Sequence, residues 1–123
     1  MTVLTLDNLR KFPAVRKTMT IHTSRGKEEH EYTLTPLSEV LNGLDPKLTQ
    51  EYARIVTKGI DNYVSGVNMA EVLEPDNVYI AYLDHGQLLK TRNGQDGSLQ
   101  IVICADPNGQ RFTKFLVSMD LQN

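Results

Sequence analysis

The chain has 123 residues, of which 40% are hydrophobic and 23% charged, the balance of an ordinary globular domain with a buried core. Its formal net charge of −2 offers no basic excess for a phosphate backbone, which counts against nucleic acid as a partner. The single cysteine excludes an internal disulfide, and no apolar run approaches the roughly 20 residues of a membrane-spanning helix. We therefore expect one domain over residues 1–123, with no membrane span.

The first third of the chain predicts a short helix followed by a β-hairpin. Residues 5–12 fit one or two helical turns that end at Pro13. Residues 17–24 and 29–34 alternate between apolar and polar side chains, which is typical of half-buried strands, and residues 24–27 form the turn between them.

A second helix is predicted directly after the hairpin. Thr35 would cap it and Pro36 would take its first helical position, where a missing amide costs nothing. The apolar face would consist of Leu37, Val40 and Leu41. Gly43 suits the left-handed residue that closes a helix, and residues 45–50 read as a polar linker.

The middle of the chain predicts two short strands and a capped helix. Residues 53–57 form the first strand, and a loop over residues 58–62 leads to the second strand, which starts at Tyr63. Asn68 and Glu71 have the spacing of a capping box, in which each side chain accepts a hydrogen bond from the other residue's amide.

The last third predicts three more strands. Residues 78–83 are apolar at every position, as in a strand covered on both faces. Residues 99–105 are again apolar, residues 106–109 form a turn, and residues 112–121 alternate. Strands outnumber the short helices that lie between them, so the fold class is α+β, strand-rich, with a mixed or antiparallel sheet.

Four stretches follow one another along nearly the whole chain: LTLDNLRKFP (4–13), YTLTPLSEVL (32–41), VYIAYLDHGQLL (78–89), and GSLQIVI with FTKF (97–103 and 112–115). Their succession resembles the molybdopterin-binding domain of the sulfite oxidase family of oxidoreductases. The resemblance implies a compact α+β domain with a grasp-like mixed sheet. In the full enzymes that fold holds a molybdenum pterin cofactor.

The resemblance also implies a cysteine metal ligand near the end of an early strand, because molybdenum takes a soft thiolate there. Residues 18–24 match that region and contain no cysteine. Gln100 stands where the family usually has a phosphate-binding arginine, and Gln95 and Asp96 replace a histidine. Lys114 alone matches a cofactor-binding position. Molybdenum is therefore not expected, and the cofactor stays unknown, with a pterin type open.

Five residues are candidates for binding a ligand: His22, Arg25, Lys58, Tyr63 and Lys114. His22 and Arg25 occupy the loop nearest the missing thiolate, and the alternative is that they face solvent beside a turn. Lys58 and Tyr63 border the cofactor cleft in the resemblance, one as a cation and one as a stacking ring. The alternative for this pair is a solvated lysine and a core tyrosine.

The other polar residues give weaker indications of a functional site. Cys104 lies in an apolar stretch and reads as an inert buried thiol. His30 reads as a partly buried residue and His85 as an exposed turn residue, and the scattered histidines lack the spacing of a zinc site. Arg92 and Arg111 could line a pocket, although Arg92 sits in a polar loop.

Three functions stay open. The leading one is a domain that binds a pterin-like or other small anionic ligand, related to molybdopterin oxidoreductases but without molybdenum redox catalysis. The second is a non-enzymatic module that binds a partner protein. The third is a divergent redox enzyme with His22 as a metal ligand; no catalytic residue can be named for it. The compartment is open as well: the first residues show no basic leader and no signal-peptide core. We expect either a cytoplasmic protein or a periplasmic or cell-surface protein whose signal was removed.

Overall fold

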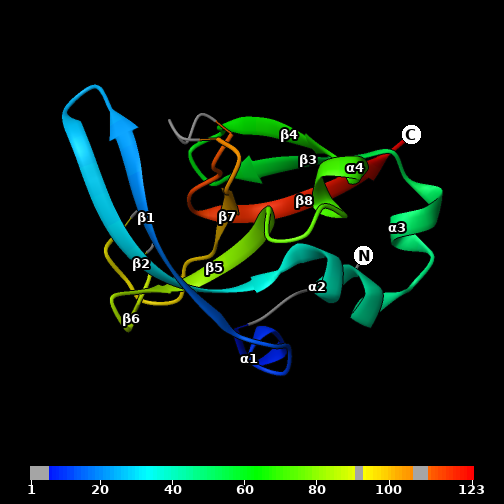
Figure 1. Cartoon of the computed structure of the whole chain (residues 1–123), viewed down its shortest axis with the longest axis horizontal. Helices are drawn as coiled ribbons and strands as arrows, with labels where there is room; N and C mark the ends of the chain where they lie inside the picture. The colour runs from blue at the N-terminus through cyan, green and yellow to red at the C-terminus, as the bar shows by residue number, and fades with distance from the viewer. Residues whose placement is uncertain (1–5, 91–92, 107–110) are drawn as a thin grey trace.

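The computed structural model describes residues 6–90, 93–106 and 111–123. This part of the chain forms a strand-rich α+β fold, as predicted, with one five-stranded and one three-stranded sheet (Figure 1). Every strand pair within it is antiparallel, so the mixed sheet that the resemblance implies does not form in the described residues.

The larger sheet begins with the predicted hairpin, which the structure confirms. Strand β1 (Val15–Thr23) pairs with β2 (Gly26–Pro36) along its whole length, and β2 pairs with β5 (Val78–Asp84). The other edge of β5 pairs with β6 (Gln87–Leu88) and with β7 (Gln100–Ile103). As predicted, β5 is buried over most of its length, because neighbouring strands pair with both of its edges and both of its faces are covered.

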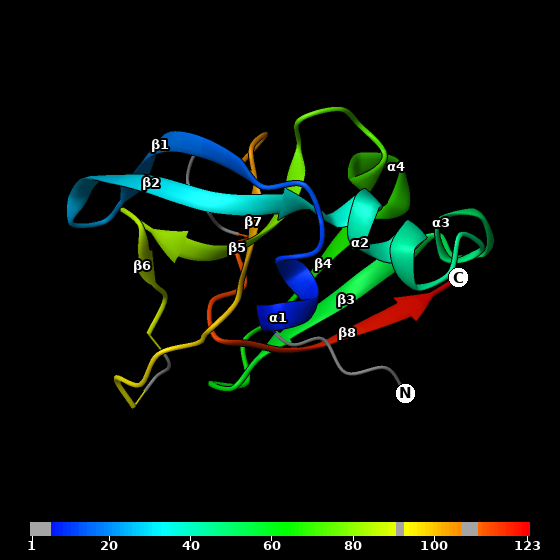
Figure 2. The ribbon, with the colours of Figure 1, turned by 90° about the horizontal axis from the view of Figure 1, so that it is seen from below.

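The smaller sheet has β3 (Arg54–Gly59) at its centre. Strand β4 (Val64–Asn68) pairs with one edge of β3, and β8 (Leu116–Gln122) pairs with the other. The predicted capping box at Asn68 is present and starts helix α4 (Met69–Val72) directly after β4. Figure 2 shows the two sheets from a second direction, with β3, β4 and β8 on one side of the molecule and the β1–β2 hairpin on the other.

The remaining helices correct three predictions. At the start of α2 (Leu37–Leu44), Pro36 is the N-cap instead of the first helical residue, and Thr35 lies in β2 and does not cap the helix. Helix α1 (Leu6–Leu9) forms as expected, but α2 continues through Gly43 and ends at an extended Asp45. Gly43 is needed for packing instead, because a Cβ atom there would lie 2.4 Å from the ring of Phe12. Helix α3 (Leu48–Glu51) occupies the stretch that was predicted to be a linker.

The last strand starts later than predicted. Phe112 and Thr113 are buried ahead of β8 instead of inside it, and Thr113 forms a bridge with Ile101 of β7 that joins the two sheets. Most of the predicted turn over residues 106–109 lies outside the described residues.

One hydrophobic cluster runs through both sheets. It contains Leu34 and Ile80 from the larger sheet and Ile55 and Val67 from the smaller one, all almost completely buried. Among the helices described, none has the length and apolar character needed to cross a membrane.

Candidate functional site

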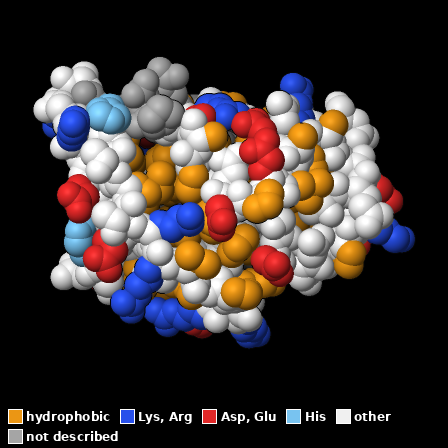
Figure 3. Space-filling view, viewed as in Figure 1, with side chains coloured by type: hydrophobic (Ala, Val, Ile, Leu, Met, Phe, Trp, Pro, Cys, Tyr) orange, Lys and Arg blue, Asp and Glu red, His pale blue; other side chains and the backbone are white. Residues whose placement is uncertain are grey.

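A cleft of about 360 Å³ lies between β1 and the segment that follows β7. Its walls are formed by seven residues: Lys17, Thr18, Met19, Thr20, Ile21, Cys104 and Asp106. Figure 3 shows a hollow with hydrophobic side chains at its floor beside the β1–β2 hairpin. The cleft therefore combines three apolar residues with four polar or charged ones, which could hold a polar small molecule.

Lys17 supplies the positive charge of this cleft. Its ammonium group lies 5.4 Å from the centroid of the Tyr79 ring, in a cation–π arrangement. The Tyr79 hydroxyl donates a 2.9 Å hydrogen bond to Asp76, and burial together with this carboxylate raises the Tyr79 pKa. Among the described residues Lys17 forms no ion pair. Its charge is therefore available to a ligand.

Cys104 corrects a prediction, because it is not buried inside an apolar strand. It lies one residue beyond β7, is half-buried, and lines the cleft. Burial raises the pKa of its thiol, and the charge of Lys17 offsets only part of that effect. The group facing the cleft at neutral pH is therefore a thiol and not a thiolate.

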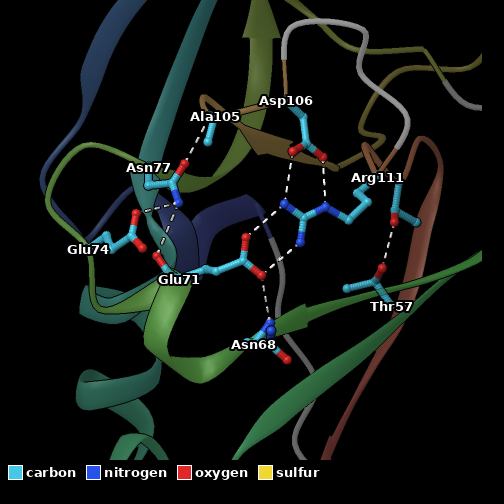
Figure 4. Close-up of polar contacts among 9 residues, drawn as sticks. Thr57, Asn68, Glu71, Glu74, Asn77, Ala105, Asp106 and Arg111 are labelled. Carbon is cyan, nitrogen blue, oxygen red and sulfur yellow. Dashed lines mark hydrogen bonds and ion pairs between the residues drawn. The ribbon is translucent and has the colours of Figure 1, made fainter.

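Asp106, in the cleft wall, forms an ion pair with Arg111, whose single positive charge it shares with Glu71. The guanidinium donates two 2.8 Å hydrogen bonds to Asp106, and two of 2.7 Å to Glu71 of α4 (Figure 4). Such bidentate pairs raise the Arg111 pKa, and the hydrogen bonds from Arg111 lower the Glu71 pKa despite partial burial. Arg111 thus fastens the segment after β7 to α4 and is not available to a ligand.

Asn77 fastens the same segment from its other side. Its side-chain oxygen accepts a 3.0 Å hydrogen bond from the Ala105 amide, and its side-chain nitrogen donates to Glu74 and to the Glu71 carbonyl (Figure 4). The Cys104 amide donates to the Asn77 carbonyl at 2.8 Å. These contacts fix Cys104 at the edge of the cleft.

Three of the five predicted ligand residues, Lys58, Tyr63 and Lys114, lie close together, away from this cleft. The Gly59 amide donates to the Tyr63 carbonyl, and a Cβ atom on Gly59 would lie 2.5 Å from the Lys114 carbonyl oxygen. All three side chains are exposed at the end of the smaller sheet. They form a surface rather than the lining of the cleft.

The other two predicted residues, His22 and Arg25, lie at the tip of the β1–β2 hairpin and are exposed. Figures 1 and 2 both place this tip apart from the turn between β3 and β4. Arg92 lies outside the described residues. Within residues 6–90, 93–106 and 111–123, no three side chains of histidine, cysteine, aspartate or glutamate form a group that could hold a metal ion.

A polar cluster that the sequence pattern did not predict surrounds Asp84. His30 Nδ1 lies 2.6 Å from one oxygen of this carboxylate, and His85 Nδ1 lies 2.8 Å from the other. The His30 ring stacks on Tyr32, whose pKa burial raises to about 12. As predicted, His30 is partly buried and His85 exposed. Finding the cluster required the pairing of β2 with β5, which the sequence pattern does not give.

Comparisons of this chain with protein-family models, with curated proteins and with solved structures found no match. The likeness to the molybdopterin-binding domain therefore stays a proposal.

Proposed function

We propose that this chain is a small ligand-binding domain, related in fold to the molybdopterin-binding domain, that holds a pterin-like or other small anion in the cleft beside β1. The proposal includes no molybdenum redox chemistry. The observation that carries it is the Lys17 ammonium in the cleft, with no ion pair among the described residues.

The charges around the cleft support an anionic ligand. Asp106 would repel an anion if it were free, but Arg111 binds both of its oxygens and offsets part of its charge. Lys17 is half-buried, so its attraction to an anion is screened less than that of a fully exposed lysine. The volume of about 360 Å³ falls within the usual range for small-molecule sites, about 300 to 1,000 Å³.

The single cysteine provides a direct test, because a ligand in the cleft would cover Cys104. The experiment measures the alkylation rate of Cys104 by a maleimide with and without 6-carboxypterin, and with inorganic phosphate as the second probe. We expect 6-carboxypterin to slow alkylation. Lys17→Gln should weaken this protection about tenfold, the effect of one partly buried charged hydrogen bond. Lys27→Gln, on the same hairpin but outside the cleft, should leave it unchanged.

Native mass spectrometry of freshly purified protein would complete the test, since it reports a retained ligand and the number of subunits together. The proposal would be overturned if the purified protein had the mass of the bare chain, with no retained ligand, and if neither probe protected Cys104. Protection that is equal in the Lys17→Gln and Lys27→Gln variants would remove Lys17 from the site.

A further inference from the structure

Exposed apolar and cationic side chains gather at the end of the smaller sheet where β3 turns into β4. We call this surface the turn patch; it consists of Lys58, Ile60, Tyr63, Val64, Lys114 and Val117. Its three aliphatic members, Ile60, Val64 and Val117, are 59%, 57% and 56% exposed. Large apolar side chains that are exposed singly are ordinary, but several around one turn mark an interaction surface.

The backbone holds the parts of the turn patch together. Lys58 pairs directly with Val64 across β3 and β4, so both side chains point to the same face of the sheet. The Ile60 amide donates a 2.9 Å hydrogen bond to the Phe115 carbonyl, which draws the chain around Lys114 and Val117 onto the turn. The patch is therefore assembled from two distant segments by fixed hydrogen bonds.

The turn patch carries a net positive charge. In the part of the chain that the structure describes, neither Lys58 nor Lys114 forms an ion pair. Asp61, the acid within the turn, accepts a 3.2 Å hydrogen bond from the Tyr63 amide and keeps its charge, so Lys58, Lys114 and Asp61 together leave one net positive charge. Two lysines are too few for a nucleic acid backbone, but they suit a polypeptide with carboxylates. A second copy of this chain bound through the same patch would place lysine against lysine, and the repulsion would disfavour such a dimer.

Beside the turn patch, β4 offers a free strand edge. In the three-stranded sheet it pairs with β3 on one side, and no described strand pairs with its other side (Figure 1). An extended polypeptide can satisfy the unpaired amides and carbonyls of such an edge by adding a strand. A lipid surface cannot, because hydrocarbon would leave these groups without partners.

We propose that the turn patch and the free edge of β4 bind an extended acidic segment of a partner protein. The backbone of that segment would pair with β4, its apolar side chains would contact Val64 and Ile60, and its carboxylates would contact Lys58 and Lys114. This binding uses no residue of the cleft, so it stands or fails independently of the small-ligand proposal.

A random-peptide display selection against the purified chain tests the inference, with counter-selection against the Lys58→Glu/Lys114→Glu variant. We expect the enriched peptides to alternate apolar and acidic residues. Their affinity, measured by fluorescence anisotropy, should fall about tenfold or more in that variant, because two attractive charge pairs become repulsive. Lys58→Gln/Lys114→Gln should give a smaller loss, and the matched control Lys11→Glu/Lys47→Glu should give none.

Amide chemical shifts of the labelled chain then locate the bound peptide. Shifts confined to residues 58–68 and 114–118 would support the inference. It would be overturned by a selection without binders, by binders that lack acidic residues, or by equal affinity for the charge-reversed and control variants. Binding of phosphatidylserine vesicles that disappears in the Lys58→Glu/Lys114→Glu variant, with no peptide binding, would replace the protein partner by a membrane surface.

Discussion

Arg111 and Lys114 are separated by two residues in the sequence, but the structure uses their charges in opposite ways. Arg111 binds Glu71 and Asp106 with both sides of its guanidinium and is about one-third exposed. Lys114 is exposed and, within the described residues, forms no ion pair. A charge that is bound on both sides stabilises the fold, whereas a charge without a partner is available for recognition. The residue type alone does not distinguish these roles.

The sharpest test of this comparison is Arg111→Ala. It leaves two partly buried carboxylates without their cation and releases the segment after β7 from α4, so we expect the free energy of unfolding to fall by about 3 kcal/mol. Urea denaturation measures this. Lys114→Ala should change stability by less than about 0.5 kcal/mol, as for an ordinary surface substitution.

Arg111→Lys separates the charge from the shape of the side chain. Lysine keeps the charge but cannot form two bidentate pairs, so we expect it to recover less than half of the loss. Arg54 is a matched control, because among the described residues its guanidinium binds the neutral side chain of Gln122 and no carboxylate. If Arg54→Ala cost as much as Arg111→Ala, the comparison between bound and free charges would be wrong.

A second test concerns the packing that assembles the turn patch. Gly59→Ala would place a Cβ atom 2.5 Å from the Lys114 carbonyl oxygen and 2.7 Å from Asp61 Oδ1. Backbone oxygen cannot move aside without shifting the start of β8, so we expect a loss of about 2 kcal/mol in unfolding free energy.

Gly66→Ala, on the neighbouring strand, is the matched control for this change. The added Cβ would lie 3.7 Å from the Ile55 carbonyl oxygen, an ordinary contact, and should be tolerated. Equal effects of the two substitutions would show that the close approach at Gly59 does not hold the patch together. Amide chemical shifts of residues 114–118 would report the displacement directly.

A third test concerns the pair of hydroxyl groups between β3 and the segment ahead of β8. Thr57 and Thr113 are buried, and their Oγ1 atoms lie 2.6 Å apart. Thr57→Val leaves the Thr113 hydroxyl without this partner and should cost about 1.5 kcal/mol of unfolding free energy. The double variant Thr57→Val/Thr113→Val should cost less than the sum of the single changes.

Thr35 offers a control for the threonine pair within the same core. Its hydroxyl is buried and has no hydrogen-bond partner among the described residues. Thr35→Val should therefore stabilise the chain or leave its thermal midpoint unchanged. A loss at Thr35 equal to that at Thr57 would mean that the cost comes from shape and not from the lost hydrogen bond.

The elements that the sequence predicted well are those with local causes. The capping box needs only Asn68 and Glu71, which are three positions apart, and the buried strand β5 follows from its unbroken apolar run. The hairpin of β1 and β2 depends on alternation and a short turn. Each of these signals lies within one short stretch, so no distant contact was needed to interpret it.

The site was less predictable because it depends on pairing between distant segments. The cleft exists because β1 lies opposite the chain after β7, and that brings Lys17 near Cys104. Arg111 reads as an available cation until the carboxylates of Glu71 and Asp106 are placed around it. The structure brings together Lys58, Tyr63 and Lys114. The sequence alone does not show whether such residues line a pocket or lie on an exposed surface.

The smallest expected effect is the pH dependence contributed by Asp84. Burial alone would raise the pKa of this carboxyl, but hydrogen bonds from His30, the Glu31 amide and His85 lower it overall. A carboxyl whose pKa is lower in the folded chain contributes stability above its unfolded pKa of about 3.9, and that contribution is lost as the pH falls through the folded pKa. Asp84→Asn should therefore cost about 1 kcal/mol at pH 7, and the difference from the unmodified chain should narrow from about pH 5 to pH 2. Urea denaturation across this pH range measures the difference in unfolding free energy, with Glu29→Gln on the same hairpin as control. If the difference between Asp84→Asn and the unmodified chain stayed constant with pH, Asp84 would act through packing instead of charge.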